Sequence, residues 1–259
     1  MTNDPWNPPQ YARFRAERAA PFEDVIALVK PTRGMNVIDL GCGNGDLTAR
    51  LAERLPDARV YGVDTSEAML AEAQRHASPH VTFARGDVAD VSALALSRYE
   101  LVFSHAALQW VGDHARWMPS LLAAMKPGAQ LAIQMPHNFA QPSHTAAVRV
   151  AASPPFRERL EGARPPASLE MEAYAEMLFR NGFRETVCFE KIYGHVFARS
   201  RDIVEWNKGT LLTAFFPRLD EAGRDAFVAV YERELLAEIG EHAPYLYTMR
   251  RMVLWARKD

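Results

Sequence analysis

The stretch Val37-Ile38-Asp39-Leu40-Gly41-Cys42-Gly43-Asn44-Gly45 decides the fold of this chain. A short apolar run ends in three closely spaced glycines, and the residues from Asp46 to Leu55 then carry leucines four positions apart. An apolar run of this length is typical of a buried strand, and leucines at this spacing form one face of a helix. The stretch therefore predicts a strand, a tight glycine loop and a helix, with the loop at the carboxyl end of the strand.

The same alternation of strand and helix continues along the chain. Further strands are expected at residues 59–64, 80–84, 99–104 and 130–135, and two more at 186–196 and 247–257. Helical patterns lie between them and also at residues 171–181, 202–213 and 220–240. Repeated strand–helix–strand units build parallel sheets with helices on both faces. We therefore predict an α/β fold with a doubly wound, mostly parallel seven-stranded sheet and a helical cover.

The organisation that this pattern predicts is one domain with added segments. An N-terminal arm and helix would occupy residues 1–30, with the helix from Tyr11 to Val29 broken near Pro21. The remaining parts would be a ligand-binding α/β core at 31–136, a partly helical cover at 137–170, a core helix and strand at 171–199, a helical cover insertion at 200–245 and a last core strand at 246–259.

Composition argues against several classes of protein. The 259 residues carry a formal net charge of −2 and no run of like charge, so a general affinity for nucleic acid is not expected. No apolar stretch approaches the roughly 18 residues of a membrane span, the first residues do not resemble a signal peptide, and two cysteines make no disulfide framework. The histidines lack zinc-site spacing. We expect a cytoplasmic, metal-free monomer or weak homo-oligomer with no membrane partner.

The glycine loop sits where open α/β folds bind ligands. A dinucleotide fingerprint would need a third glycine at position 46, but Asp46 stands there, and its carboxylate would repel a pyrophosphate. The pattern suits a ligand with an amino-acid end, whose ammonium would lie near Asp39. The alternative interpretation is a plain tight turn.

Two further carboxylates follow the next two strands. Asp64 can accept hydrogen bonds from a ribose diol, and Asp87 can accept one from the exocyclic amine of an adenine while the Val88 amide faces a ring nitrogen. Each aspartate could instead cap the following helix. Three such residues at three successive strand ends favour a ligand that combines an amino acid with a nucleoside.

These motifs resemble those of the class I S-adenosylmethionine-dependent methyltransferases over roughly residues 34–136. A closer resemblance, to the trans-aconitate methyltransferases, is carried by Trp6-Asn7-Pro8, by residues 66–73, by Ala107-Leu108-Gln109-Trp110 and by Gln134-Met135-Pro136. The resemblance implies S-adenosyl-L-methionine as cofactor, S-adenosyl-L-homocysteine as its product, and a small anionic acceptor. It implies a methyl ester formed on a polycarboxylate such as trans-aconitate.

The resemblance also implies which residues form the site. The expected cofactor-binding residues are Arg18, Asp39, Gly41, Gly43, Asp64, Thr65, Met69, Asp87, Val88, Ser104 and Ala106. The expected substrate-binding residues are Tyr11, His105, Gln109, Trp110, His137, Asn138 and Trp206, with Asn207 and either Arg149 or Arg218 as further candidates from the cover. No catalytic residue is expected, because a carboxylate is already ionised at neutral pH and needs no base.

Other functions stay open on the sequence alone. The acceptor could be a malonyl-thioester carboxylate, a hydroxyl or a carbon atom of another metabolite. A nicotinamide oxidoreductase is disfavoured by Asp46, and a cofactor-binding protein without activity would need the same glycine loop.

Overall fold

A computed structural model describes residues 15–259, with side chains described from residue 20 onward. Within this part of the chain, seven strands form one sheet in the order β3-β2-β1-β4-β5-β7-β6. The strands are β1 (Asn36–Leu40), β2 (Arg59–Asp64), β3 (Val81–Arg85), β4 (Leu101–His105), β5 (Gln130–Pro136), β6 (Phe183–Phe197) and β7 (Tyr245–Lys258). The first five are parallel, and β7 runs antiparallel to both β5 and β6.

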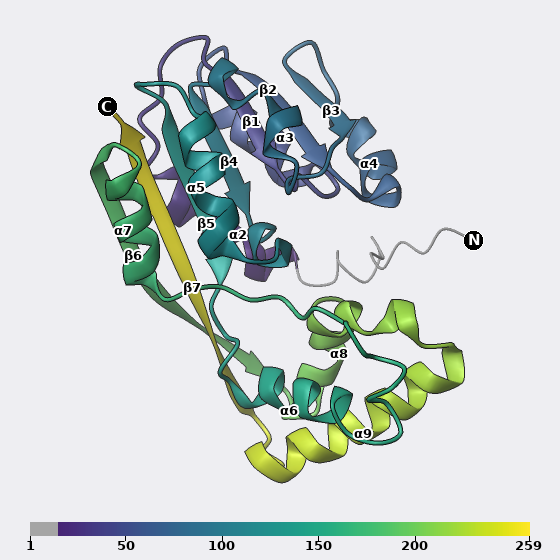
Figure 1. The fold of residues 1–259 in the computed structure, drawn as a ribbon. Helices are drawn as coiled ribbons and strands as arrows, with labels where there is room; N and C mark the ends of the chain where they lie inside the picture. The colour runs from purple at the N-terminus through teal and green to yellow at the C-terminus, as the bar shows by residue number, and fades with distance from the viewer. Residues whose placement is uncertain (1–14) are drawn as a thin grey trace.

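Helices cover both faces of this sheet (Figure 1). The helices are α2 (Arg15–Ile26), α3 (Asp46–Arg54), α4 (Glu67–Ala73), α5 (His114–Ala124), α6 (Pro142–Ala151), α7 (Met171–Arg180), α8 (Asp202–Lys208) and α9 (Glu221–Ile239), of which α6, α8 and α9 lie apart from the sheet. Short 3₁₀ turns lie at Gln74–His76, Val91–Leu94, Leu96–Arg98, Leu108–Trp110, Leu211–Ala214 and Phe216–Arg218.

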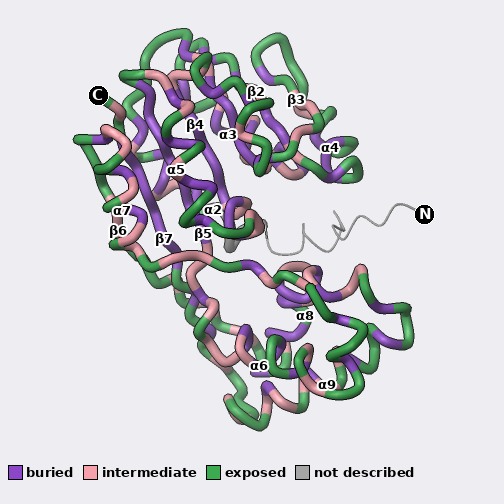
Figure 2. The backbone as a smooth tube through the Cα atoms, in the orientation of Figure 1, coloured by how far each residue is buried: buried purple, intermediate pink, exposed green. Residues whose placement is uncertain are grey.

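The sheet separates two hydrophobic cores. Apolar residues of α5 and α7 pack on one face, and apolar residues of α2 and α3 pack on the other. Because both faces are covered, the central strands β4 and β5 are buried almost along their whole length, as Figure 2 shows.

A third core belongs to a separate layer. We call the layer built from α6, α8, α9 and their connections the helical cover; its buried residues include Trp206, Phe227 and Tyr231. Tyr247 and Met249 of β7 join this core, so the long β6–β7 hairpin extends beyond the sheet to support the cover. Figure 1 shows this hairpin crossing from the sheet to the cover.

The predicted fold class is confirmed, with three local corrections. The first helix is not broken near Pro21 but runs through it, because Phe22, Val25 and Ile26 bury their side chains against the sheet and offset the lost amide. The helix expected at 202–213 ends at Lys208 and is followed by a separate 3₁₀ turn. Strand β6 is longer than expected because it pairs with β7 throughout.

Two findings concern the kinds of site present. In residues 15–259, no helix is long and apolar enough to cross a membrane. The same residues contain no group of three or more His, Cys, Asp or Glu side chains arranged to hold a metal ion.

Candidate functional site

The glycine loop is fixed by backbone geometry. Gly41, Gly43 and Gly45 all have positive φ angles, of 77°, 55° and 77°. A side chain at Gly41 would in addition collide with the Cβ atom of Ala107, which follows β4. The amide of Gly41 donates to the carbonyl of Val63 at 2.8 Å. The loop is thereby held at the carboxyl edge of the sheet, between strands β2 and β4, where only glycine fits.

Asp64 at the end of β2 connects the loop to the next helix. One carboxylate oxygen accepts the Gly43 amide and the other accepts the Ser66 amide, each at 2.9 Å. These two amides occupy two of the roughly four acceptor sites of a carboxylate. The helix cap itself is Ser66, whose hydroxyl accepts the Met69 amide at 3.1 Å. Asp64 is therefore fixed in orientation and is not the capping residue of α4.

Asp39 lies beneath the loop and not in the cavity above it. Its side chain is buried, and it accepts a hydrogen bond of 2.6 Å from the Thr48 hydroxyl of α3. Burial raises its pKa to about 7; the Thr48 hydrogen bond opposes this, and the charge of nearby Asp64 adds to it. The carboxyl group is thus poised to change its protonation state near neutral pH.

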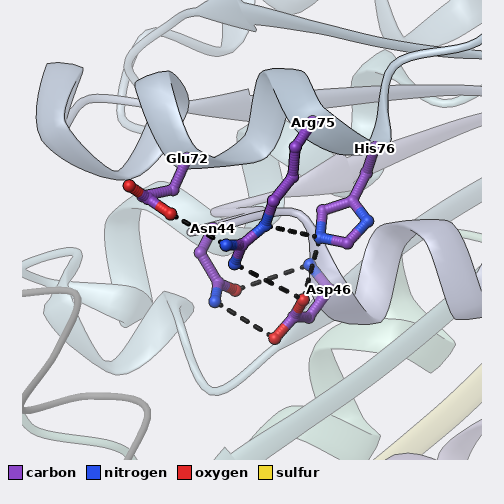
Figure 3. Close-up of polar contacts among 5 residues, drawn as sticks. All are labelled: Asn44, Asp46, Glu72, Arg75 and His76. Atoms are coloured by element: carbon purple, nitrogen blue, oxygen red, sulfur yellow. Dashed lines mark hydrogen bonds and ion pairs between the residues drawn. The ribbon is translucent and has the colours of Figure 1, made fainter.

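Asp46, which stands where a dinucleotide fingerprint has glycine, is in contact with three neighbouring side chains. Figure 3 shows its carboxylate between Arg75 and His76 on one side and Asn44 on the other. The carboxylate lies 2.9 Å from His76 Nε2 and 3.8 Å from an Arg75 nitrogen, and it accepts a hydrogen bond of 3.2 Å from the Asn44 amide. An acidic residue in the first turn of α3 is also favoured by the helix dipole.

Above the loop lies a cavity of about 340 Å³, which we call the cofactor cavity. Its lining comes from the ends of β1, β2, β3 and β4 and from the residues that follow them. The lining residues are Gly41, Gly43, Asp64, Thr65, Met69, Asp87, Val88, Ala89, His105, Ala106, Ala107, Trp110, Val111 and Gly112. This set of polar and apolar groups fits a nucleoside. Asp64 offers oxygens to a diol, and Asp87, Val88 and the buried Met69 line the same cavity.

A second cavity, which we call the acceptor cavity, shares His105, Ala106 and Trp110 with the first. It lies between the sheet and the helical cover. Its other lining residues are Pro21, Gln109, Gln134, Pro136, Asn138, Phe139, His144, Pro166, Trp206, Asn207, Thr210, Leu211, Tyr247 and Arg251. Ala106 adopts a left-handed conformation with φ of 54°, so a strained backbone forms part of the shared wall.

Arg251 gives the acceptor cavity a buried positive charge. Its side chain comes from β7, is 9% exposed and donates to the sulfur of Met249 at 3.4 Å. His144 of α6 lines the same cavity. Burial, and then the charge of Arg251, lower the pKa of His144 to about 4, so this imidazole is neutral at pH 7. A buried guanidinium beside neutral polar groups suits an anion, and above all a carboxylate.

The structure brings most, but not all, of the expected cofactor residues to one cavity. Eight of the expected cofactor residues line the cofactor cavity: Gly41, Gly43, Asp64, Thr65, Met69, Asp87, Val88 and Ala106. Asp39 and Ser104 do not line it; the Ser104 hydroxyl donates to the Leu40 carbonyl at 2.7 Å and joins two strands. The Arg18 side chain and Tyr11 lie outside the described residues.

The expected substrate residues divide in the same way. His105, Gln109, Trp110, Asn138 and Trp206 line the acceptor cavity. His137 does not line either cavity; its Nδ1 pairs with the Ser168 hydroxyl at 2.7 Å.

Neither arginine suggested from the cover faces the site. Arg149 forms an ion pair of 2.5 Å with Glu238, and Arg218 donates to the carbonyls of Glu161 and Gly162. The arginine that lines the acceptor cavity is Arg251, which sequence reasoning missed together with Gln134, His144 and Tyr247, whereas Asn207, a candidate from the cover, does line it. One signal for Arg251 was present in the sequence. Arg251 stands in the alternating series with Met249, Val253 and Trp255, whose other members are apolar and buried.

Comparisons with known proteins agree with this geometry. Residues 31–164 match the family model described as "Methyltransferase domain". A trans-aconitate 2-methyltransferase of Deinococcus radiodurans is 38% identical over 94% of this chain and 95% of its own length. One of Paracidovorax citrulli is 39% identical over 98% of each chain. Among solved structures, the YcgJ protein of Bacillus subtilis is similar in fold, with a TM-score of 0.62 at 13% identity over 93% of this chain and 98% of that one.

Fold, glycine loop and family model together define a class I methyltransferase. Within that class, the chain belongs to the trans-aconitate 2-methyltransferase family, because it is 35–39% identical to several members over most of its length.

Proposed function

We propose that this protein transfers the methyl group of S-adenosyl-L-methionine to a carboxylate of trans-aconitate and releases a methyl ester and S-adenosyl-L-homocysteine. Membership of the family supports both the cofactor and the acceptor. The observation that carries the proposal is the wall shared by the two cavities. His105, Ala106 and Trp110 line both, so a ligand in one cavity would meet a ligand in the other beside these residues.

The cofactor cavity would hold S-adenosyl-L-methionine, which supplies an electrophilic methyl group on a sulfonium. Asp64 would accept from the ribose hydroxyls, since its carboxylate is fixed by the Gly43 and Ser66 amides. Asp87 and Val88 would bind the adenine, and the Met69 side chain would cover it. Asp39 would act from beneath the loop, through its charge and through Thr48.

The acceptor cavity would orient a carboxylate for in-line attack. The Arg251 guanidinium can hold one carboxylate, while the aromatic side chains of Trp110 and Trp206 exclude water from the remainder. A carboxylate with a pKa of about 4 is ionised at neutral pH, so no side chain has to remove a proton. Because no general base is needed, the protein would contribute the positioning and the partial desolvation of the acceptor carboxylate.

The test is the chemical form of the product. The enzyme is incubated with trans-aconitate and cofactor labelled in the methyl group, and the product is treated with mild alkali. An ester releases volatile labelled methanol. Label that stays on the product would identify an ether, an amine or a carbon-linked methyl group and would refute methylation of a carboxylate.

We further propose a cytoplasmic enzyme that acts as a monomer or weak homo-oligomer and has no nucleic-acid partner. The support is the net charge of −2 and two free cysteines, of which Cys42 is buried. The core at 31–136 and the cover segments at 137–170 and 200–245 would act as parts of one domain. Size-exclusion chromatography with light scattering at several concentrations measures the first property, and a single cooperative unfolding transition would support the second.

A further inference from the structure

Two buried glutamines on strand β5 differ in one respect. Gln130 has partners for both its amide oxygen and its amide nitrogen: the oxygen accepts the Lys30 amide at 2.8 Å and the Trp255 indole at 3.0 Å, and the nitrogen donates to the Lys30 carbonyl at 2.7 Å. Gln134 is 1% exposed. Neither its amide nitrogen nor its amide oxygen has a hydrogen-bond partner in the part of the chain that the structure describes.

The register of the sheet places Gln134 at the centre of the site. It pairs with His105 on β4 and with Val253 on β7. Arg251 pairs with Pro136, two residues further along β5, so both side chains lie on the same face of the sheet. Gln134, His105 and Arg251 all line the acceptor cavity.

An unpaired buried amide lowers the stability of a folded protein, because it has lost its hydrogen bonds to water. Gln130 shows that this strand can provide partners for both the oxygen and the nitrogen of a buried glutamine. Gln134 differs because its amide lies in a cavity beside a buried guanidinium, where a ligand can supply the missing partner. Its NH₂ group is a pure donor, and two kinds of donor converging on one cavity select an anionic oxygen.

We propose that Gln134 is a specificity-determining residue that binds a carboxylate of the acceptor together with Arg251. This inference rests on the proposed function, since it assigns a role within the same cavity. The Gln134 nitrogen donates to a carboxylate oxygen, and its own carbonyl oxygen accepts from a water molecule that enters with the acceptor. A compact molecule with two or more carboxylates fills this role: one group binds at Gln134 and Arg251, and another lies at the shared wall beside His105.

The experiment compares Gln134→Met with Gln130→Met, a matched change on the same strand and the same face. Three quantities are measured for each variant: the KM for trans-aconitate at saturating cofactor, the Kd for S-adenosylhomocysteine by calorimetry, and the Tm. For Gln134→Met we expect the KM to rise about tenfold or more, the Kd to stay within about twofold and the Tm to stay equal or rise. For Gln130→Met we expect the opposite: a lower Tm and a KM within about twofold of wild type.

An unchanged KM in Gln134→Met would overturn the inference. A fall in Tm as large as that of Gln130→Met would also overturn it, because Gln134 would then be a satisfied structural residue. If Gln134→Met does not fold, the isosteric Gln134→Glu decides, since its carboxylate would repel the acceptor and must raise the KM. Failure of the proposed function is distinguishable, because it would appear in the wild-type enzyme as absence of alkali-labile ester.

Discussion

The substitution Asp39→Asn should stabilise the protein relative to wild type, and this gain in stability should be larger at alkaline pH than at acidic pH. Asp39 is buried with one hydrogen-bond donor, Thr48, at 2.6 Å. Burial raises its pKa from the ordinary value of 3.8 to about 7. Between these two values the folded protein holds a proton that the unfolded chain releases. The native state therefore loses stability as the pH rises, until Asp39 ionises in the fold near pH 7.

The magnitude follows from the two pKa values. A difference between 3.8 and about 7 corresponds to about 4 kcal/mol, since each pKa unit is worth about 1.4 kcal/mol. At pH 5 the cost to wild type is about 1.5 kcal/mol, and at pH 8 the full cost applies. An asparagine does not ionise, and its carbonyl oxygen can still accept from Thr48. The stability of Asp39→Asn relative to wild type should therefore increase by about 2.5 kcal/mol between pH 5 and pH 8.

Urea unfolding of both proteins at pH 5, 6, 7 and 8 measures this difference. The variant Asp57→Asn is the control, because Asp57 is exposed and its ion pair with Arg33 lies at the surface. Its free energy of unfolding should stay within about 0.5 kcal/mol of wild type at each pH. A stability difference between Asp39→Asn and wild type that is constant with pH would refute the reasoning. It would mean that Asp39 is ionised in the fold well below neutral pH.

Four further outcomes follow from the same geometry. Asp64→Asn should raise the Kd for S-adenosylhomocysteine about tenfold and lower the Tm, because its NH₂ group would face the Gly43 or the Ser66 amide; an unchanged Kd by calorimetry would remove Asp64 from the site. Wild type should lose up to about 3 kcal/mol of stability as the pH falls from 6.5 to about 4, because His144 stays neutral in the fold while it is protonated in the unfolded chain. Urea unfolding of His144→Gln should lack this part of the dependence of stability on pH. If the variant keeps it, the assignment to His144 is wrong. Arg251→Lys should lower kcat/KM for trans-aconitate about tenfold or more, since lysine keeps the charge but loses the two-pronged contact; wild-type kinetics would show that a point charge suffices. Limited proteolysis of the helical cover should slow when S-adenosylhomocysteine and trans-aconitate are both present, and equal rates would argue against closure.

The lining of the cavity at the glycine loop could be predicted because its signals are local. The loop from Gly41 to Gly45 needs left-handed backbone at all three glycines, and Asp64 and Asp87 follow strands whose ends share one edge of the sheet. These constraints are visible within a few residues of sequence. Asp39 and Ser104 are expected to line the cavity but do not. Asp39 accepts a hydrogen bond from Thr48 and Ser104 donates one to Leu40, and such contacts with neighbouring elements are not visible in the sequence.

The acceptor side could not be predicted in the same way. Arg251 and Gln134 share a cavity only because β7 runs antiparallel to β5 in the register that pairs Arg251 with Pro136. A shift of one residue would turn either side chain to the other face of the sheet. His144 reaches the cavity from a helix of the cover, and no sequence pattern fixes where that helix lies.

The β6–β7 hairpin joins the sheet to the helical cover through a two-stranded ribbon. Strand β7 pairs with β5 only from Arg251 onward, so β6 is the one strand that pairs with residues 245–250, which also form hydrogen bonds with His137, Asn138 and Gln141. Arg251 thus belongs to the rigid sheet, whereas Tyr247, four residues earlier, belongs to the core of the cover. A bend of the narrow two-stranded ribbon would tilt the cover while the guanidinium and Gln134 stay in place. The rate at which acceptor enters and ester leaves is then expected to depend on how readily these two paired strands bend, and Gly194, which pairs with Thr248, is a glycine inside them.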